Sequence, residues 1–223
     1  MKRFLVVFGV FLVLSSVLGY IISDNGIPKV HRTESPSEKP PSVAQVVSRI
    51  DSYPSFCWAV SGTSLPIPFF GIQAEGVKGC VNYVNSSAVY WIEDVDGRTF
   101  LRRVSSAEDD LEWQVIASTT WPELNIIKFL KRVLKSGNVT EVKRAGDYYE
   151  FHLFLRTEYE SNAGTIENPY IFRTVEMWNV TLVVNGNGKP LGGHLSGRGR
   201  GPSNIYGANW FQEGNFTISG GWD

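Results

Sequence analysis

Few residues of this chain could do chemistry, and none of them forms a familiar catalytic arrangement. Of its three histidines, His31 lies in a proline-rich stretch, His152 in an alternating apolar segment and His194 in a glycine-rich segment. No two histidines have the spacing of a zinc-protease helix, and no glycine-rich phosphate loop precedes an expected helix. The serine of Gly193-His-Leu-Ser-Gly197 stands one position too late for a nucleophile elbow. We therefore expect no catalytic residue, no metal site, no cofactor and no enzymatic activity.

Two further groups of polar residues have chemical alternatives. His194 stands near Arg198 and Arg200, a set that could bind an anion or could simply occupy a glycine-rich loop. Acidic residues cluster at 93–96 and 108–110, where paired carboxylates could serve a glycosidase or bind calcium. Both clusters coincide with expected turns, in which Asp is favoured because it forms local hydrogen bonds. We favour the loop interpretation for the first group and the turn interpretation for the second.

The first 22 residues indicate export. Met1-Lys2-Arg3 precedes an apolar run from Phe4 to Ile22, which is about long enough to span a bilayer as a helix. The positive-inside rule places the two basic residues in the cytoplasm and the rest of the chain outside it. The run is either the anchor of a single-pass protein of the cell membrane or a signal peptide cleaved after Gly19, which would make the protein secreted.

The rest of the chain divides into a tether and one domain. Residues 23–41 contain four prolines and almost nothing apolar, so we expect a flexible tether that reaches about 25 Å. Residues 42–223 are numerous enough for one extracytoplasmic domain with its own core. The chain carries 21 basic and 22 acidic residues without a long basic stripe, which argues against a nucleic-acid partner.

Export makes a disulfide and N-glycosylation possible, and the sequence contains candidate residues for both. Cys57 and Cys80 lie in separate strand-like segments, and in an exported domain we expect a disulfide between them, with two buried thiols as the alternative. Sequons are also present, and they accept glycans only in an exported chain and in a host that glycosylates. Their asparagines are Asn85, Asn138, Asn179 and Asn215.

The residue periodicity predicts a mostly β domain with two helices. A capping box begins a helix over Ser42–Asp51, and a second helix should begin at Thr120 and end at Gly137. Alternation predicts strands elsewhere, including Leu111–Ala117, and Asp-Gly and Asn-Gly turns at 94–97 and 185–188 predict hairpins. Strands joined by short turns favour one antiparallel sheet, which must curve at this number of strands. We therefore expect an α+β fold, a curved antiparallel half-barrel covered by two helices.

The segment Glu176–Leu191, EMWNVTLVVNGNGKPL, resembles a hairpin of the outer-membrane lipoprotein carrier (LolA/LolB-like) superfamily. In that superfamily an alternating strand, a polar turn and a Leu-Pro-like return follow one another, usually with Asp where this chain has Asn185. The expected order of elements is similar over most of the domain. The resemblance implies a curved sheet that holds acyl chains or another apolar ligand under its helices, without chemistry.

Large apolar residues on the inward phase of the expected strands are the candidate ligand-binding residues. They either fill a core or line a cavity for an apolar ligand, and they are Trp58, Trp113, Phe151, Leu153, Trp178 and Leu182. We expect a membrane-tethered extracytoplasmic domain that binds a lipid-like or other apolar ligand. The alternative is a structural or protein-interaction domain of the cell envelope with a filled core, whose protein partner the sequence does not identify.

Overall fold

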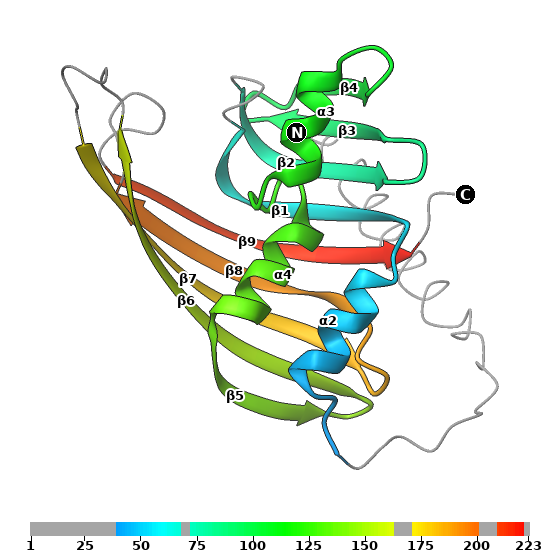
Figure 1. Ribbon diagram of the computed structural model, residues 1–223, viewed down its shortest axis with the longest axis vertical. Helices are drawn as coiled ribbons and strands as arrows, with labels where there is room; N and C mark the ends of the chain where they lie inside the picture. The colour runs from blue at the N-terminus through cyan, green and yellow to red at the C-terminus, as the bar shows by residue number, and fades with distance from the viewer. Residues whose placement is uncertain (1–38, 68–71, 163–170, 201–208, 221–223) are drawn as a thin grey trace, which may run out of the picture. The chain divides into compact units, whose positions relative to one another are not determined.

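A computed structural model describes residues 39–67, 72–162, 171–200 and 209–220 (Figure 1). The expected membrane segment at 1–22 and nearly all of the tether at 23–41 lie outside these residues. Within the described ranges, no helix combines the length and the apolar character that crossing a membrane requires.

The domain is built on one open sheet of nine antiparallel strands in the order β4-β3-β2-β1-β9-β8-β7-β6-β5. The mostly β, antiparallel architecture predicted from the sequence is thereby confirmed. The strands are β1 (Ser55–Ile67), β2 (Ile72–Asn82), β3 (Ser87–Asp94), β4 (Thr99–Ser105), β5 (Asn138–Ala145), β6 (Tyr148–Asn162), β7 (Ile171–Asn185), β8 (Pro190–Arg200) and β9 (Asn209–Gly220).

The sheet consists of two meanders, β1 to β4 and β5 to β9, which the pairing of β1 with β9 joins. Strands β4 and β5 therefore form opposite edges of the sheet, although they follow one another in sequence. The chain between them must cross a face of the sheet, and it does so through α3 (Asp110–Ser118) and α4 (Ile126–Ser136). Figure 1 shows that α2 (Val43–Asp51) lies over the same face, around which the sheet curves. We call this the concave face.

Helix α2 begins and ends as its sequence predicts. The Ser42 hydroxyl accepts a hydrogen bond from the Gln45 backbone N–H at 3.2 Å, and the Gln45 side chain accepts one from the Ser42 N–H at 2.7 Å. These two bonds complete the capping box and satisfy backbone donors that a helix otherwise leaves free. Val46 and Ile50, one helical turn apart, are fully buried against the sheet.

The region between β4 and β5 differs from the sequence prediction in two ways. The predicted strand at 111–117 is helix α3, because Asp109 caps it by accepting from the Glu112 N–H at 3.0 Å and because Trp113 and Ile116 face the core at helical spacing. The helix predicted from Thr120 begins only at Ile126, where Asn125 accepts from the Lys128 N–H. The described part of the domain thus has three helices, and the prediction of two covering helices is wrong.

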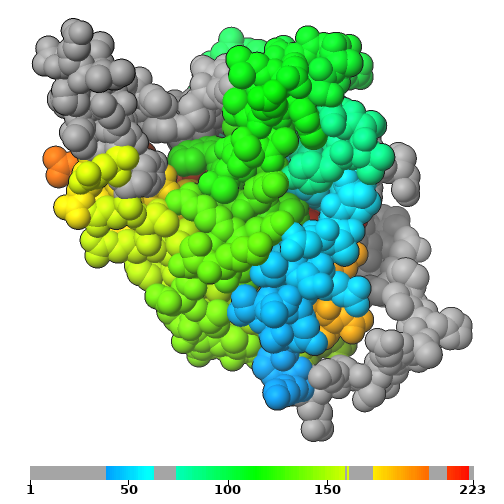
Figure 2. Space-filling view, viewed as in Figure 1, coloured from blue at the N-terminus to red at the C-terminus, as the bar shows by residue number. Residues whose placement is uncertain are grey.

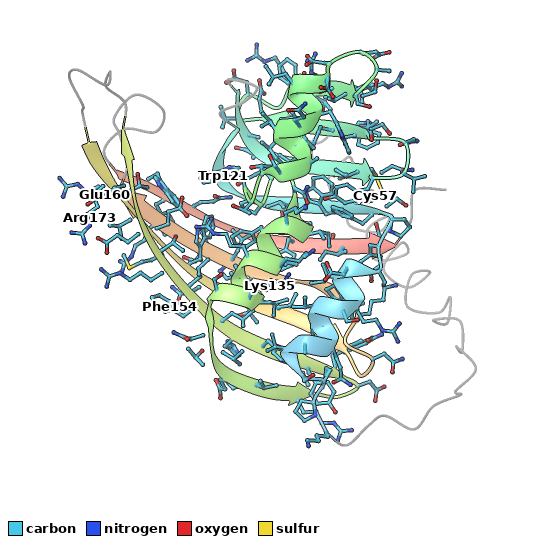
Figure 3. All side chains as sticks on the ribbon, in the orientation of Figure 1. Cys57, Trp121, Lys135, Phe154, Glu160 and Arg173 are labelled. Carbon is cyan, nitrogen blue, oxygen red and sulfur yellow. A yellow bond between two sulfur atoms is a disulfide. The ribbon has the colours of Figure 1, made fainter. Side chains whose placement is uncertain are left out.

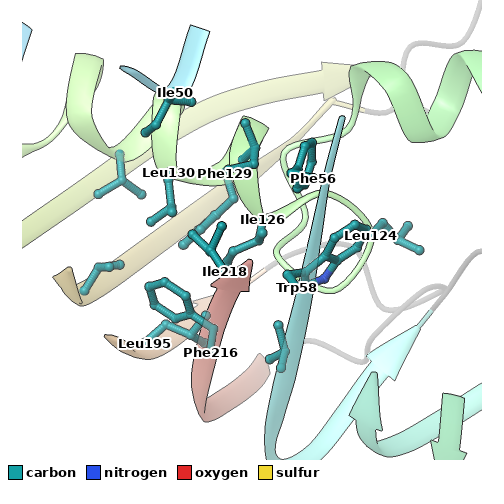
Figure 4. Packing of buried hydrophobic residues seen from close by; sticks show 14 of the residues in the cluster. Ile50, Phe56, Trp58, Leu124, Ile126, Phe129, Leu130, Leu195, Phe216 and Ile218 are labelled. Carbon is teal, nitrogen blue, oxygen red and sulfur yellow. The ribbon is translucent and has the colours of Figure 1, made fainter. Parts of the chain in front are cut away.

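One hydrophobic core lies between the helices and the concave face. Helix α4 contributes six buried apolar residues, and Phe129 and Leu130 among them have no exposed surface. Figure 4 shows Ile126, Phe129 and Leu130 of α4 in one cluster with Trp58 of β1 and Phe216 of β9. Each such buried side chain stabilises the folded state by roughly 1.5–3 kcal/mol. In the space-filling view of Figure 2, α2, α3 and α4 form a continuous cover over this core.

Candidate functional site

Four aromatic side chains meet on the concave face near the connection between α3 and α4. The Trp178 ring of β7 lies 5.3 Å from Trp210 of β9, 6.1 Å from Trp121 and 4.8 Å from Phe129, measured between ring centroids. Trp121, labelled in Figure 3, belongs to the connection itself and lies 5.5 Å from Trp210. We call Trp121, Phe129, Trp178 and Trp210 the aromatic cluster.

Two glycines of β8 make room for this cluster. A Cβ atom added at Gly197 would lie 2.3 Å from the Trp178 ring, and one added at Gly199 would lie 2.5 Å from the Trp210 ring. The two indoles therefore lie flat against the sheet, one over each glycine. Trp178 is 1% exposed, whereas Trp121 and Trp210 are half-buried. The aromatic cluster thus extends from the core to the surface of the domain.

Several buried side-chain polar atoms lack a hydrogen-bond partner among the described residues, and they are spread over the domain, with Trp58 Nε1 on β1 and His152 Nε2 on β6 among them. Both amide atoms of Gln212 and both carboxyl oxygens of Glu123 are in this state, and both residues have no exposed surface. The Thr174 hydroxyl and the Trp178 indole Nε1 are also buried and without a partner among the described residues. Each such group costs about 1–3 kcal/mol if nothing binds it. We call Glu123, Thr174, Trp178 and Gln212 the polar set.

The strand register places two members of the polar set, Trp178 and Gln212, close together on the concave face. Trp178 pairs with Gly197, and Gly197 pairs with Gln212 on the next strand. Since Gly197 has no side chain, little separates the Trp178 indole from the Gln212 amide. Thr174 follows on β7 with the inward phase of Trp178, four residues away. The concave face therefore carries an indole and an amide in one row across β7 to β9, and the Thr174 hydroxyl lies about 13 Å along β7 from that row.

Glu123 belongs to the crossing connection between α3 and α4. At one end of the connection Trp121 contacts Trp178 of β7. At the other end the Tyr90 hydroxyl of β3 donates to the Leu124 carbonyl at 2.8 Å. The connection thus passes over the strands between β7 and β3, and Glu123, which belongs to it, has no exposed surface. Figure 4 shows the following residue, Leu124, beside Trp58 of β1.

Burial controls the protonation of Glu123. Removal from water disfavours the charged carboxylate and raises the pKa of Glu123 to about 8. The backbone N–H of the same residue offsets part of this effect, although it lies outside hydrogen-bonding geometry. The side chain is therefore mostly protonated at pH 7. A protonated carboxyl offers one donor and one acceptor, so Glu123 adds uncharged hydrogen-bonding capacity to the polar set.

The charged groups beside the aromatic cluster neutralise one another. Arg132 of α4 donates to Glu176 of β7 at 2.6 Å and to the Thr157 hydroxyl of β6 at 2.7 Å. It also donates to Thr120 at 3.2 Å, which ties the crossing connection to α4. Glu176 pairs with Thr157 across β6 and β7 and with Gly199 on β8, beside Trp210. This ion pair holds the connection in place above the aromatic cluster.

The six predicted cavity-lining residues all lie in the core. Trp58, Phe151, Leu153, Trp178 and Leu182 stand on strands of the concave face, whereas Trp113 lies on helix α3 rather than on a strand. All six are at least nine-tenths buried and belong to one packed cluster. Of these six, Trp178 is also part of the aromatic cluster.

Sequence reasoning missed Glu123, Gln212, Trp121 and Trp210. Gln212 carries a signal that could have identified it, because it is a polar residue on the same phase as Trp210, Phe216 and Ile218. Glu123 was predicted to complete a capping box that begins at Thr120, an interpretation that assigns it a local role at a helix end. Its burial depends on the crossing connection, which no local pattern shows.

The disulfide predicted between Cys57 and Cys80 is confirmed. The two residues pair directly across β1 and β2, on the convex face of the sheet. Next to them lies an open groove of about 800 Å³, which Trp91, Glu93 and Thr99 also line. Trp91 is 41% exposed. The groove lies on the opposite face of the sheet from the aromatic cluster.

Both described histidines also lie on the convex face. His152 pairs with Thr181, Thr181 with His194, and His194 with Asn215, so these four residues form one row across β6 to β9. The segment around His194 was predicted to be a glycine-rich loop, but it is strand β8. Its backbone pairs with β7 on one side and with β9 on the other. Arg198 and Arg200 share the outward phase of that strand. His31 lies outside the described residues.

The remaining sequence features have mainly local roles. Asp94 accepts hydrogen bonds from the backbone N–H of Arg98 at 2.8 Å and from its guanidinium at 2.9 Å, as expected at a turn. Asp109 caps α3. The sequon asparagines Asn85, Asn138, Asn179 and Asn215 are all exposed, and their glycosylation stays a prediction.

Two comparisons with known proteins, by family model and by sequence, found no match. The resemblance to the lipoprotein carrier superfamily therefore stays a prediction from the hairpin at 176–191 and the order of elements.

Proposed function

We propose that residues 42–223 form a membrane-tethered extracytoplasmic binding domain for a lipid-like or other apolar ligand, and that the domain performs no chemistry. The ligand would lie against the aromatic cluster on the concave face. The observation that supports this proposal best is the polar set, whose buried atoms have no described partner beside the tryptophans. Natural domains seldom leave such groups unsatisfied, and a bound molecule or ordered water usually accounts for them.

The aromatic cluster suits an apolar ligand. Indole rings offer large apolar surfaces together with an N–H group, which is why Trp is common where one end of a bound molecule is apolar and the other polar. Trp121 and Trp210 are half-buried, so a ligand could contact the aromatic cluster from the surface of the domain. Binding energy would come from apolar area removed from water, at roughly 25 cal/mol per Å².

The N-terminal run and the disulfide support the proposed extracytoplasmic location. The run Phe4–Ile22 supports export, and the Cys57–Cys80 bridge is the kind of link that persists in an oxidising compartment. The tether at 23–41 would keep the domain close enough to the membrane to exchange an apolar molecule with it.

A structural or protein-interaction domain of the cell envelope is the second candidate. The observation that favours it is the packing of Trp58, Phe151, Leu153 and Leu182 into one filled cluster with α2 and α4. On this view, side chains fill the interior and the domain contacts partners through its surface. The two candidates differ in whether a molecule occupies the polar set.

Native mass spectrometry of the full-length protein, released from nanodiscs, tests the proposal. We expect a stoichiometric excess mass that organic extraction releases as a lipid-like molecule. A bare protein mass, unchanged after incubation with mixed lipids, would instead support the structural or protein-interaction domain.

A further inference from the structure

We propose that the concave site selects a ligand whose polar end is uncharged and forms hydrogen bonds, such as a long-chain alcohol or a neutral glyceride. This inference rests on the proposed function and specifies its ligand class. Two observations support it. The groups of the polar set are uncharged hydrogen-bond donors and acceptors, and the nearby charges of Arg132 and Glu176 already pair with each other.

The polar set offers both donors and acceptors but no fixed charge. The Gln212 amide supplies two N–H donors and one acceptor oxygen, and the Trp178 indole supplies one donor. The Thr174 hydroxyl and the protonated Glu123 carboxyl can each do both. A hydroxyl or ester group matches this mixture, because it can accept from one side chain and, when it is a hydroxyl, donate to another.

Among the residues that the structure describes, a charged polar end would find no suitable counter-ion at this place. Arg132 already binds Glu176 at 2.6 Å, so its charge is neutralised before a ligand arrives. Lys128, on the same helix, lies 5.8 Å from the Tyr83 ring, at the end of the connection away from Trp178. Burying an ion without a partner costs far more than burying a hydroxyl that is hydrogen-bonded. An anionic or cationic head group is therefore disfavoured.

Three ten-carbon probes that differ only in their polar end test the inference. Decanol, decanoate and decylamine are titrated at pH 7 into the full-length protein in nanodiscs by calorimetry, and the heat of partition into empty nanodiscs is subtracted. We expect decanol to bind at least about tenfold more tightly than either ion, because the shared chain cancels and the head group decides.

The substitution Gln212→Leu identifies the residue that binds the head group. Loss of one hydrogen bond should weaken decanol binding about fivefold, while the variant stays folded because Leu fills a similar volume. Gln114→Leu, the same change at an exposed site on α3, should leave binding unchanged. Glu123→Gln keeps an uncharged hydrogen-bonding group and should retain decanol.

The outcomes separate the two proposals. Binding of decanoate or decylamine as tight as that of decanol would overturn the uncharged head group while leaving the binding domain intact. Unchanged decanol binding in Gln212→Leu would overturn the role of the polar set. If no probe binds and the purified protein also carries no ligand, both the inference and the proposed function fail.

Discussion

At the scale of single residues, the burial of Glu123 links the stability of the domain to pH. The side chain has no exposed surface, and burial raises the pKa of Glu123 to about 8 from an ordinary value of 4.5. The unfolded chain therefore loses this proton near pH 4.5, whereas the folded domain keeps it until about pH 8. Between these values the folded state binds more protons, so its stability falls as the pH rises.

The substitution Glu123→Gln should remove this dependence. For the wild-type protein we expect the free energy of unfolding to fall by on the order of 1.4 kcal/mol per pH unit between about pH 5 and pH 8. The variant should show a much flatter profile in the same window. Urea unfolding at several pH values, followed by tryptophan fluorescence, measures both slopes. Equal slopes in the two proteins would show that Glu123 is not held protonated.

Gln212 shows what sequence can and cannot reveal about a single residue. The alternation along β9 places residue 212 on the inward phase, between Trp210 and Phe216, so its burial could be predicted. Its lack of a described partner could not, because that depends on which side chains the neighbouring strands and the crossing connection bring near it.

At the scale of elements, local signals predicted the ends of α2 and the two hairpin turns. The capping box of Ser42 and Gln45 is complete in sequence, and Gly97 and Gly188 both adopt a φ of +76° as their turns require. Helix α3 was missed because Trp113, Val115 and Ala117 alternate like a strand. Two interactions favour the helix: the cap by Asp109 and the burial of Trp113 in the core. The burial of Trp113 is a tertiary effect, which the local sequence does not show.

The register of β8 makes Gly197 essential to the packing of Trp178. A methyl group at Gly197 would meet the indole at 2.3 Å, so we expect Gly197→Ala to destabilise the domain by about 1–3 kcal/mol. Gly186→Ala is the matched control, because its added Cβ would meet nothing within 4 Å. Thermal unfolding by circular dichroism compares the two variants. Equal melting temperatures would contradict the flat packing of Trp178 on β8.

At the scale of the whole molecule, two meanders join into one open sheet. Short turns allowed each meander to be predicted, but the pairing of β1 with β9 brings together residues such as Cys57 and Ser219. No local pattern specifies a contact of that sequence separation. The crossing of α3 and α4 over the concave face follows from this pairing, so the aromatic cluster and the polar set could not be predicted as a site.

The disulfide should stabilise the whole domain. It closes a loop with a sequence separation of 23, for which the chain-entropy model gives about 3 kcal/mol. The double variant Cys57→Ala and Cys80→Ala should therefore unfold at a lower urea concentration than the oxidised protein. The reduced wild-type protein serves as the control and should resemble the variant. An unchanged midpoint in both would show that the bridge contributes little.

The measurement that tests the binding site most directly compares ligand content in two tryptophan variants. Trp210→Ala removes a half-buried ring of the aromatic cluster, and Trp91→Ala removes a partly exposed ring on the convex face. Full-length proteins purified in parallel are analysed by native mass spectrometry for the fraction that carries a lipid-like molecule. We expect Trp210→Ala to lose most of the ligand and Trp91→Ala to retain it. Equal ligand content in the two variants, or loss only in Trp91→Ala, would contradict binding on the concave face.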